Sequence, residues 1–136
     1  MAHSAAMIRV LKARENVANK DKWFADVIYN VPIIETTSIK TMDTNGLCVR
    51  FNPVFVLEHT DHVEGVFCHE GWHVILDHVG RRGTRLPMDW NIAADAIINP
   101  MVAKRGWSLP DGHVRIPDVE KGKMSAERAY EWIRKQ

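Results

Sequence analysis

The sequence feature that most constrains the fold is an apolar segment, residues 61–79, that contains His69, Glu70 and His73. Its apolar residues occur around the whole circumference of a helix, so we expect a helix that crosses the core and ends at Gly80. At about 100° per residue, the two histidines lie some 40° apart on the helix surface and one turn apart along it. Histidines buried in this way need polar partners, and a single metal ion could serve both.

The spacing His69-Glu70-x-x-His73 predicts a particular chemistry. Neutral imidazoles are common zinc ligands, and a glutamate beside the metal can take a proton from a water molecule and pass it to a leaving amine. We therefore predict Zn²⁺ as the cofactor, Glu70 as the catalytic residue, and a peptide or protein as the substrate. Two alternatives stay open: histidines that only make hydrogen bonds within the core, and a zinc-stabilised binding or regulatory module without catalysis.

A catalytic zinc site needs a third protein ligand, and a second apolar segment, residues 89–99, offers one. Its polar residues Asn91, Asp95 and Asn99 repeat at intervals of four and form one stripe on a helix. A polar stripe on a buried helix must meet polar groups. We predict that Asp95 binds the metal and that the two asparagines fix its orientation. Pro100 is expected to interrupt or kink this helix.

The polar stripe has a second interpretation, in which it only hydrogen-bonds to neighbouring loops and another residue completes the site. The candidates are then His78, His113, Asp89 and Glu64. On an ideal helix His78 points about 180° away from His69, which argues against it as a ligand. Asp77 lies on the same side as Glu70 and His73, and we expect it to hydrogen-bond a ligand histidine.

The rest of the chain indicates an α+β fold. Residues 5–29 show the spacing of apolar residues that is typical of an amphipathic helix or a broken helix pair. Residues 33–42 and 47–51 are rich in Thr, Ile and Val and flank an Asn45-Gly46 turn, which predicts an antiparallel hairpin. A terminal helix is expected after Ser125, which can cap it.

Composition narrows the range of functions. A chain of 136 residues, of which 46% are hydrophobic, can bury the core of one domain, residues 1–136, without disulfides. A formal net charge of +1 argues against nucleic acid as a partner. The arginines that follow the motif are interpreted as complements of the helix dipole rather than as phosphate ligands. The apolar surroundings of Cys48 and Cys68, and the lack of a long apolar segment, predict a cytoplasmic protein that does not enter a membrane.

Several blocks of the sequence resemble a known family. They are Thr41 to Asn52; His69-Glu70-x-x-His73 with His78 and Arg81-Arg82-Gly83; Trp90 to Asp95 followed by Ile98-Asn99-Pro100; Leu109-Pro110; and Ser125-Ala126-Glu127 with Tyr130. In this order they resemble the putative metallopeptidase domain that often precedes a von Willebrand factor A-like domain in bacterial proteins and also occurs in phage. The resemblance covers residues 32–135 and leaves residues 1–31 as an N-terminal helical segment.

The resemblance implies a zincin-like fold, in which the motif helix packs against a second ligand-bearing helix and a small antiparallel sheet. It implies His69 and His73 as metal ligands, Glu70 as the catalytic residue, and Asp95 as the further ligand. No von Willebrand-type domain follows in this sequence, so we expect that the chain acts alone or recruits a separate partner subunit. By the same comparison, strand 47–51 either binds an extended substrate peptide or only covers the core.

Overall fold

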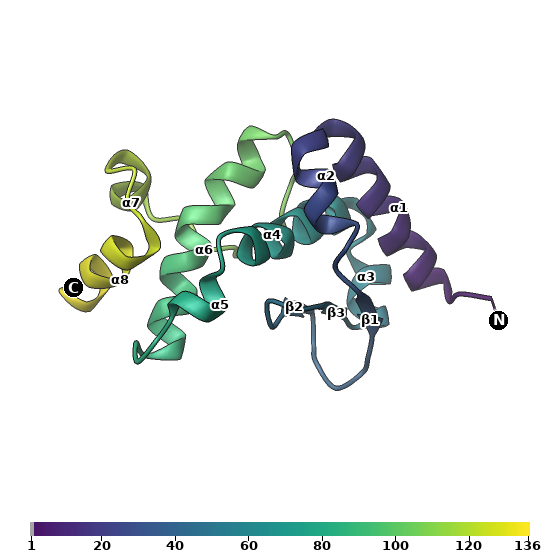
Figure 1. Cartoon of the computed structure of the whole chain (residues 1–136), viewed down its shortest axis with the longest axis horizontal. Coiled ribbons are helices and arrows are strands. Elements are labelled where there is room, and N and C mark those ends of the chain that lie inside the picture. Colours follow the sequence, from purple (N-terminus) through teal and green to yellow (C-terminus); the bar gives the residue numbers. More distant parts are fainter. Residues whose placement is uncertain (1) are drawn as a thin grey trace.

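The computed structural model describes residues 2–136 and shows helices arranged around a central helix, α4, with a small sheet on one side (Figure 1). In chain order the elements are α1 (Ala5–Lys20), α2 (Lys22–Ile28), β1 (Ile33–Glu35), β2 (Met42–Thr44), β3 (Val49–Phe51), α3 (Pro53–Glu58), the short 3₁₀ helix η1 (Thr60–His62), α4 (Val63–Ile75), α5 (His78–Arg81), α6 (Pro87–Lys104), α7 (Pro117–Lys121) and α8 (Ala126–Arg134). The α+β class is confirmed, whereas the finer zincin-like fold stays a prediction. None of the helices in residues 2–136 combines the length and the apolar character needed to cross a membrane.

The N-terminal segment forms the predicted broken helix pair. Ser4 caps α1 by accepting a hydrogen bond from the backbone N–H of Met7. The pair breaks at Asp21, whose backbone leaves the helical region with φ −139° and ψ 85°. The buried face of α1 includes Val10 and Val17, which belong to the same core cluster as residues of α4. The N-terminal helices are therefore part of the core that holds the motif helix.

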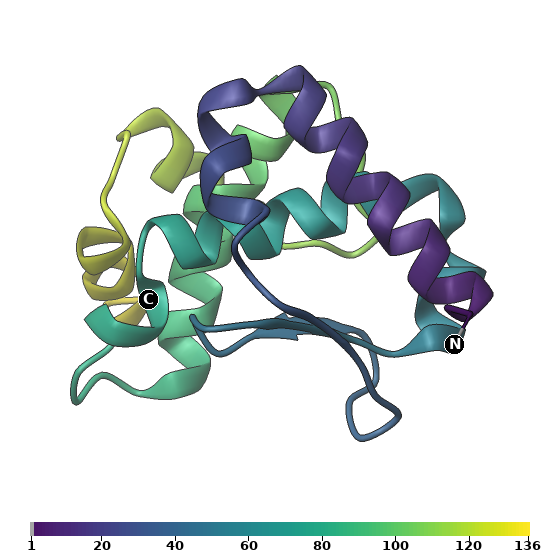
Figure 2. The same cartoon turned by 45° about the vertical axis from the view of Figure 1, so that its right-hand side comes forward.

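The sheet has the order β1-β3-β2 and lies beneath α4 (Figure 2). The predicted hairpin is confirmed, since β2 pairs antiparallel with β3 and the turn contains Gly46 at φ 90°. The expectation of one long first strand and a purely antiparallel sheet is wrong, because residues 33–35 pair parallel with β3 and a loop separates them from β2. Strand β3 is thus paired on both sides, and β1 and β2 each have one free edge.

The motif helix is shorter than predicted. Helix α4 ends at Ile75, and Asp77 adopts the left-handed conformation with φ 51°. The carboxylate of Asp77 accepts a hydrogen bond from the N–H of Gly80 and so caps the separate helix α5. The predicted stop at Gly80 in the left-handed region is wrong, because the chain turns three residues earlier and Gly80 is helical. Aspartate tolerates this conformation better than most residues with a Cβ atom.

The second long helix continues beyond Pro100, where the sequence predicted an interruption or a kink. Pro100 lies inside α6, which extends to Lys104. The proline removes one helical hydrogen bond, and in a helix interior this costs about 3 kcal/mol. Ile98 and Val102, on either side of the proline, are both fully buried, and burial of each side chain contributes roughly 1.5 to 3 kcal/mol. Packing therefore offsets the cost of the proline.

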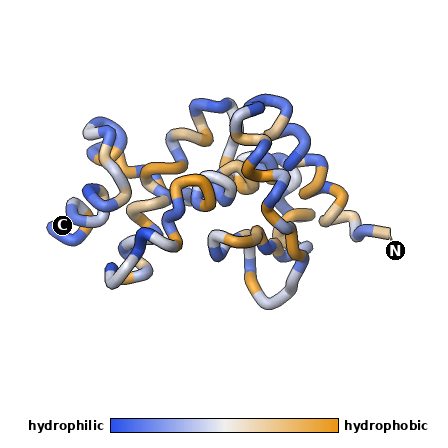
Figure 3. The backbone as a smooth tube through the Cα atoms, viewed as in Figure 1, coloured by the Kyte–Doolittle hydropathy of each residue, from blue (hydrophilic) through white to orange (hydrophobic). Residues whose placement is uncertain are grey.

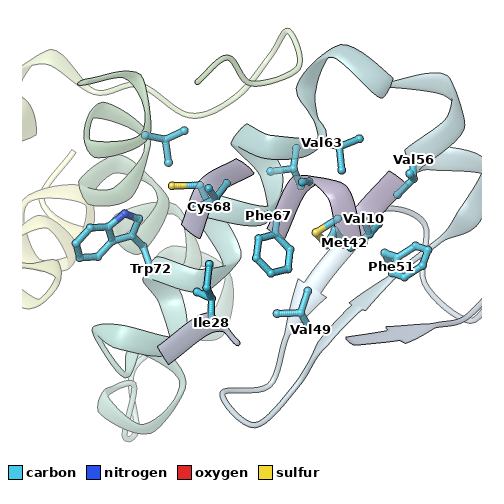
Figure 4. Packing of buried hydrophobic residues seen from close by; sticks show 14 of the residues in the cluster. Val10, Ile28, Met42, Val49, Phe51, Val56, Val63, Phe67, Cys68 and Trp72 are labelled. Carbon is cyan, nitrogen blue, oxygen red and sulfur yellow. The ribbon is translucent and has the colours of Figure 1, made fainter. Parts of the chain in front are cut away.

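Two hydrophobic clusters meet at the interface between α4 and α6. The larger one fills the space between α1, α2, the sheet and α4, where Phe67 points toward Ile28 and Val49 (Figure 4). Figure 3 shows hydrophobic segments gathered around α4, in contrast to the more hydrophilic C-terminal region. The smaller cluster lies between α6, α7 and α8 and includes Trp90 and Tyr130. Ser125 caps α8 as predicted.

Candidate metal centre

Three side-chain atoms from α4 and α6 converge on one point between the helices. Nε2 of His69 lies 3.0 Å from Nε2 of His73, and Oδ1 of Asp95 lies 3.1 Å and 3.0 Å from these two atoms. The histidines face the same way because they are one turn apart on α4. Asp95 reaches them from the stripe on α6 that the sequence predicted to be polar.

The orientation of His69 is fixed by an asparagine. Nδ1 of His69 lies 2.7 Å from Oδ1 of Asn99, whose Nδ2 donates to the carbonyl oxygen of Val114 at 2.8 Å. Because the amide nitrogen is used as a donor, Oδ1 of Asn99 is the acceptor and Nδ1 of His69 carries the hydrogen. Nε2 of a neutral His69 therefore presents a lone pair toward His73 and Asp95.

His73 is supported by a third histidine. Its Nδ1 lies 3.1 Å from Nδ1 of His78, the first residue of α5. Burial, together with the electrostatic influence of the neighbouring His73 and Arg81, lowers the pKa of His78 to about 4, so this imidazole is neutral at pH 7. The sequence argued against His78 as a ligand because a continuous helix would turn it away. The break at Asp77 instead places it behind His73.

Electrostatics within the group favour a bound cation. Burial alone would lower the pKa of His69, but the hydrogen bond to Asp95 and the charges of Glu70 and Asp95 outweigh it and raise the pKa to about 9. Burial would likewise raise the pKa of Asp95, yet the hydrogen bonds from His69 and His73 hold it well below its usual range. The site therefore retains a proton on His69 at neutral pH when no metal is bound.

The donor set fits a metal ion. Two imidazole lone pairs and a carboxylate oxygen at 3.0 to 3.1 Å repel one another unless a proton or a metal cation lies among them. Zinc binds nitrogen and oxygen at 2.0 to 2.2 Å, so ligand atoms in a tetrahedral site are separated by about 3.3 Å. The observed separations are close to this value. Nitrogen and carboxylate ligands in this number are also the usual set for zinc.

Glu70 is the other carboxylate near the histidines. Single ligand atoms of His69, Glu70 and His73 lie within 4.8 Å of one another, so these residues could also hold a metal ion. However, Oε2 of Glu70 is 3.9 Å from Nε2 of His69, farther than the 3.1 Å from Oδ1 of Asp95. Geometry therefore favours Asp95 for direct binding. Burial raises the pKa of Glu70, whose side chain is only 9% exposed, and a raised pKa suits a group that accepts and returns a proton.

The group forms the floor of a cleft of about 550 Å³. Its lining includes Thr41, strand β2 and the loop 109–114. This loop comes close to α4 at Gly65, where a Cβ atom would lie 1.8 Å from the carbonyl oxygen of Ser108. A larger residue at Gly65 would push the loop away. The cleft is therefore open to solvent between a strand edge and a loop, with the histidines and Glu70 at its base.

Two of the predicted supporting residues have other contacts. Asp77 was expected to hydrogen-bond a ligand histidine, and this prediction is wrong, because its exposed carboxylate caps α5 instead. Asn91 lines the cleft but is exposed, and within residues 2–136 its side chain makes no hydrogen bond to Asp95. Asn99 does orient a group of the site, but that group is His69 rather than Asp95.

The alternative third ligands are placed away from the three converging atoms. Glu64 binds Arg9 at 2.6 Å, and Asp89 binds Arg134 at 3.0 Å. His113 lines the cleft, with its Nδ1 2.9 Å from the carbonyl oxygen of Pro110. The sequence missed the role of the Val114 carbonyl, because a backbone contact from a distant loop leaves no signal in residue types or spacing.

The arginines that follow the motif helix make contacts within the protein. Arg81 pairs with Glu127 and donates to the carbonyl oxygen of Leu76 at 2.7 Å. The guanidinium of Arg85 lies 5.2 Å from the centre of the Trp90 ring. These contacts tie α5 and the following loop to the second hydrophobic cluster, which supports a structural role for Arg81 and Arg85.

Comparison with known proteins gives one match. A family model described as a putative metallopeptidase domain matches residues 6–136. The match includes α1 and α2 as well as the motif helix and its neighbours. Neither the curated proteins nor the solved structures contain a match to the chain.

Proposed function

Since the chain belongs to the putative metallopeptidase domain family, we propose that it is a zinc-dependent peptidase whose metal is held by His69, His73 and Asp95. The observation that carries this proposal is the convergence of three lone-pair atoms at 3.0 to 3.1 Å beside a buried glutamate. Three protein ligands leave one position of a tetrahedral site open, as catalytic zinc sites require.

Glu70 is proposed as the group that moves protons. When bound, zinc polarises a carbonyl group and lowers the pKa of water. Glu70 lies at the base of the cleft, where its carboxylate can take a proton from the attacking water and give it to the leaving amine nitrogen. Burial supports this role, because it raises the pKa of Glu70 toward the pH at which both transfers occur readily.

The free edge of β2 supports an extended peptide as the substrate. Asn52 donates its N–H to the carbonyl oxygen of Thr41 at 2.7 Å, which marks a hydrogen-bonded pair of the ladder. Since such pairs alternate, the backbone N–H and C=O groups of Met42 and Thr44 point away from β3. Both residues line the cleft. A peptide could add to this edge and place a bond near Glu70. Strand 47–51, considered at first, has no free edge.

The cysteines bear on where the protein acts. Cys48 and Cys68 are both free thiols. Burial raises the pKa of Cys68 to about 12, so this thiol is inert as a nucleophile. Free thiols suit a reducing compartment, and we infer a cytoplasmic location.

The test compares metal content and hydrolysis in the same variants. Wild-type protein should bind about one zinc ion per chain, and His73→Ala and Asp95→Ala should lose it, as elemental analysis would show. Glu70→Gln should keep the metal and lower hydrolysis of an unstructured protein substrate by roughly 10² to 10⁴-fold, because only the proton-transfer group is removed.

Two outcomes would contradict the proposal. A wild-type protein that binds no zinc after reconstitution leaves a helical core whose histidines only form hydrogen bonds. A protein that binds zinc and is stabilised by it, yet cleaves no substrate with or without Glu70, is a zinc-stabilised binding module.

A further inference from the structure

We propose that His78 is a positioning residue for the metal centre: its imidazole accepts a hydrogen bond from Nδ1–H of His73 and directs Nε2 of His73 to the metal. The inference rests on the zinc site proposed above. It goes beyond that site because His78 is not among the converging atoms. His78 acts from behind one of the histidines.

The contact between the two imidazoles is direct and buried. The two Nδ1 atoms are 3.1 Å apart, and His78 is only 3% exposed. Two nitrogen atoms at this distance need one hydrogen between them, so one ring donates and the other accepts. Among residues 2–136, the side chain of His78 makes no other hydrogen bond, which leaves His73 as its polar partner.

Metal binding selects the direction of this hydrogen bond. If His78 donated, a neutral His73 would carry its own hydrogen on Nε2, 3.0 Å from Nε2 of His69 and 3.0 Å from Asp95. That hydrogen would occupy the position where a lone pair is needed for zinc. If His78 accepts, His73 carries its hydrogen on Nδ1 and Nε2 is free to bind the metal. Ligand histidines generally donate their other N–H to such a partner.

The chain turns sharply in order to bring His78 to this position. Five residues along a continuous helix would separate His78 from His73 by about 140°. Helix α4 instead ends at Ile75, and the left-handed conformation of Asp77 returns the chain toward the site. Residues with a Cβ atom adopt this conformation rarely, and those that do are concentrated at functional sites.

Helix α6 holds His78 in place from the other side. The indole N–H of Trp90 donates to the carbonyl oxygen of His78 at 2.7 Å. The Trp90 ring packs edge-on against the His78 ring, with centroids 5.9 Å apart. Both the backbone and the ring of His78 are therefore fixed by a buried residue of the second hydrophobic cluster. A fixed acceptor can hold the His73 ring in one orientation.

The test measures zinc affinity in a pair of variants. His78→Leu removes the acceptor at similar volume, whereas His78→Asn keeps an oxygen near the position of Nδ1. His59→Leu is the control, because His59 is half-buried and, like His78, is hydrogen-bonded through Nδ1, yet does not line the cleft. Zinc affinity is measured by competition with a coloured chelator, and the visible spectrum of the Co²⁺-loaded protein reports ligand geometry.

We expect His78→Leu to weaken zinc binding about 10- to 100-fold and to change the Co²⁺ spectrum. His78→Asn should stay within a few-fold of the wild type, and the control should not differ from it. Equal affinity in His78→Leu and wild type would overturn the proposal. Equal weakening in His78→Leu and His78→Asn would also overturn it, because packing alone would then explain both.

A second measurement uses the wild-type protein and needs no variant to fold. Histidine ¹⁵N NMR of the zinc-loaded protein distinguishes the two neutral forms of each ring. His78 should carry its hydrogen on Nε2, and His73 on Nδ1. A hydrogen on Nδ1 of His78 would refute the proposal. If the wild-type protein binds no zinc at all, the proposed zinc site itself is refuted. That result differs from weakened or unchanged zinc affinity in the His78 variants and from a hydrogen on Nδ1 of His78 in the zinc-loaded protein.

Discussion

The two histidines of the motif helix are supported in different ways. His69 donates to Asn99, and Asn99 continues to the backbone carbonyl of Val114 in the loop that forms one wall of the cleft. His73 contacts His78, which is held by Trp90 in the second hydrophobic cluster. One support connects the site to the cleft wall, and the other connects it to the packing of α5 against α6.

The difference follows from the chemistry of the two supporting side chains. A carboxamide has a donor and an acceptor in fixed positions, so Asn99 fixes which nitrogen of His69 carries the hydrogen. A neutral imidazole can donate or accept at Nδ1, so in our proposal a bound metal determines which nitrogen of His78 carries the hydrogen. We therefore expect the Asn99 support to contribute more to stability, and the His78 support to act mainly through metal binding.

The largest effect is expected from Asn99→Leu. This change leaves the N–H of His69 and the carbonyl of Val114 without partners, so the free energy of unfolding should fall by roughly 2 to 4 kcal/mol. Zinc affinity should fall by up to about 100-fold. Urea unfolding and chelator competition measure the two effects. Asn91→Ala is the control on the same helix and should change stability by less than about 0.5 kcal/mol.

A smaller effect is expected on the pH dependence of stability in metal-free protein, where His69 and His78 should act in opposite directions. His69 has a raised pKa of about 9, so its contribution to stability is present below pH 6.5 and is lost as the pH rises to 9. His78 has a lowered pKa of about 4, so the unfolded chain takes up the proton first and stability is lost as the pH falls from 6.5 to 4.

The measurement is the difference in unfolding free energy between wild type and each single variant across this pH range. The difference in unfolding free energy between wild type and His78→Asn should shrink by about 1 to 3 kcal/mol toward acid pH. The difference between wild type and His69→Asn should shrink by a similar amount toward alkaline pH. If these free-energy differences changed with pH in the same way for both variants, His69 and His78 would not differ in their effect on stability.

The smallest effect is expected at the turn between α4 and α5. Asp77→Gly loses the cap but accepts the left-handed conformation without strain, so stability should change by less than about 1 kcal/mol and zinc affinity by less than about threefold. Asp77→Val disfavours the same conformation and should weaken zinc binding more. Equal zinc affinity in the two variants would mean that the turn does not control the position of His78.

Much of the site could be predicted from local spacing. The His69-Glu70-x-x-His73 spacing places two imidazoles on one arc of a helix, and the four-residue interval brings Asp95 and Asn99 onto one stripe. The hairpin turn and the Ser125 cap were also predictable, because they depend on neighbouring residues. These features are determined by helix and turn geometry, whatever surrounds them.

The rest depended on contacts between distant parts of the chain. The sequence predicted a helix through Val79, and the break at Asp77 that brings His78 to His73 is stabilised by Trp90 of α6. It predicted a break at Pro100, but burial of the flanking apolar residues keeps α6 continuous.

The sequence by itself determined the residue types of the candidate metal site, their common faces, and the α+β class. Only the tertiary structure decided which groups support those residues and which strands have a free edge. The physical reason is that a helical face follows from a period of about 3.6 residues, which any local segment contains. The partner of a buried polar atom depends instead on where the rest of the chain packs, and α6, α5 and the loop 109–114 supply these partners here.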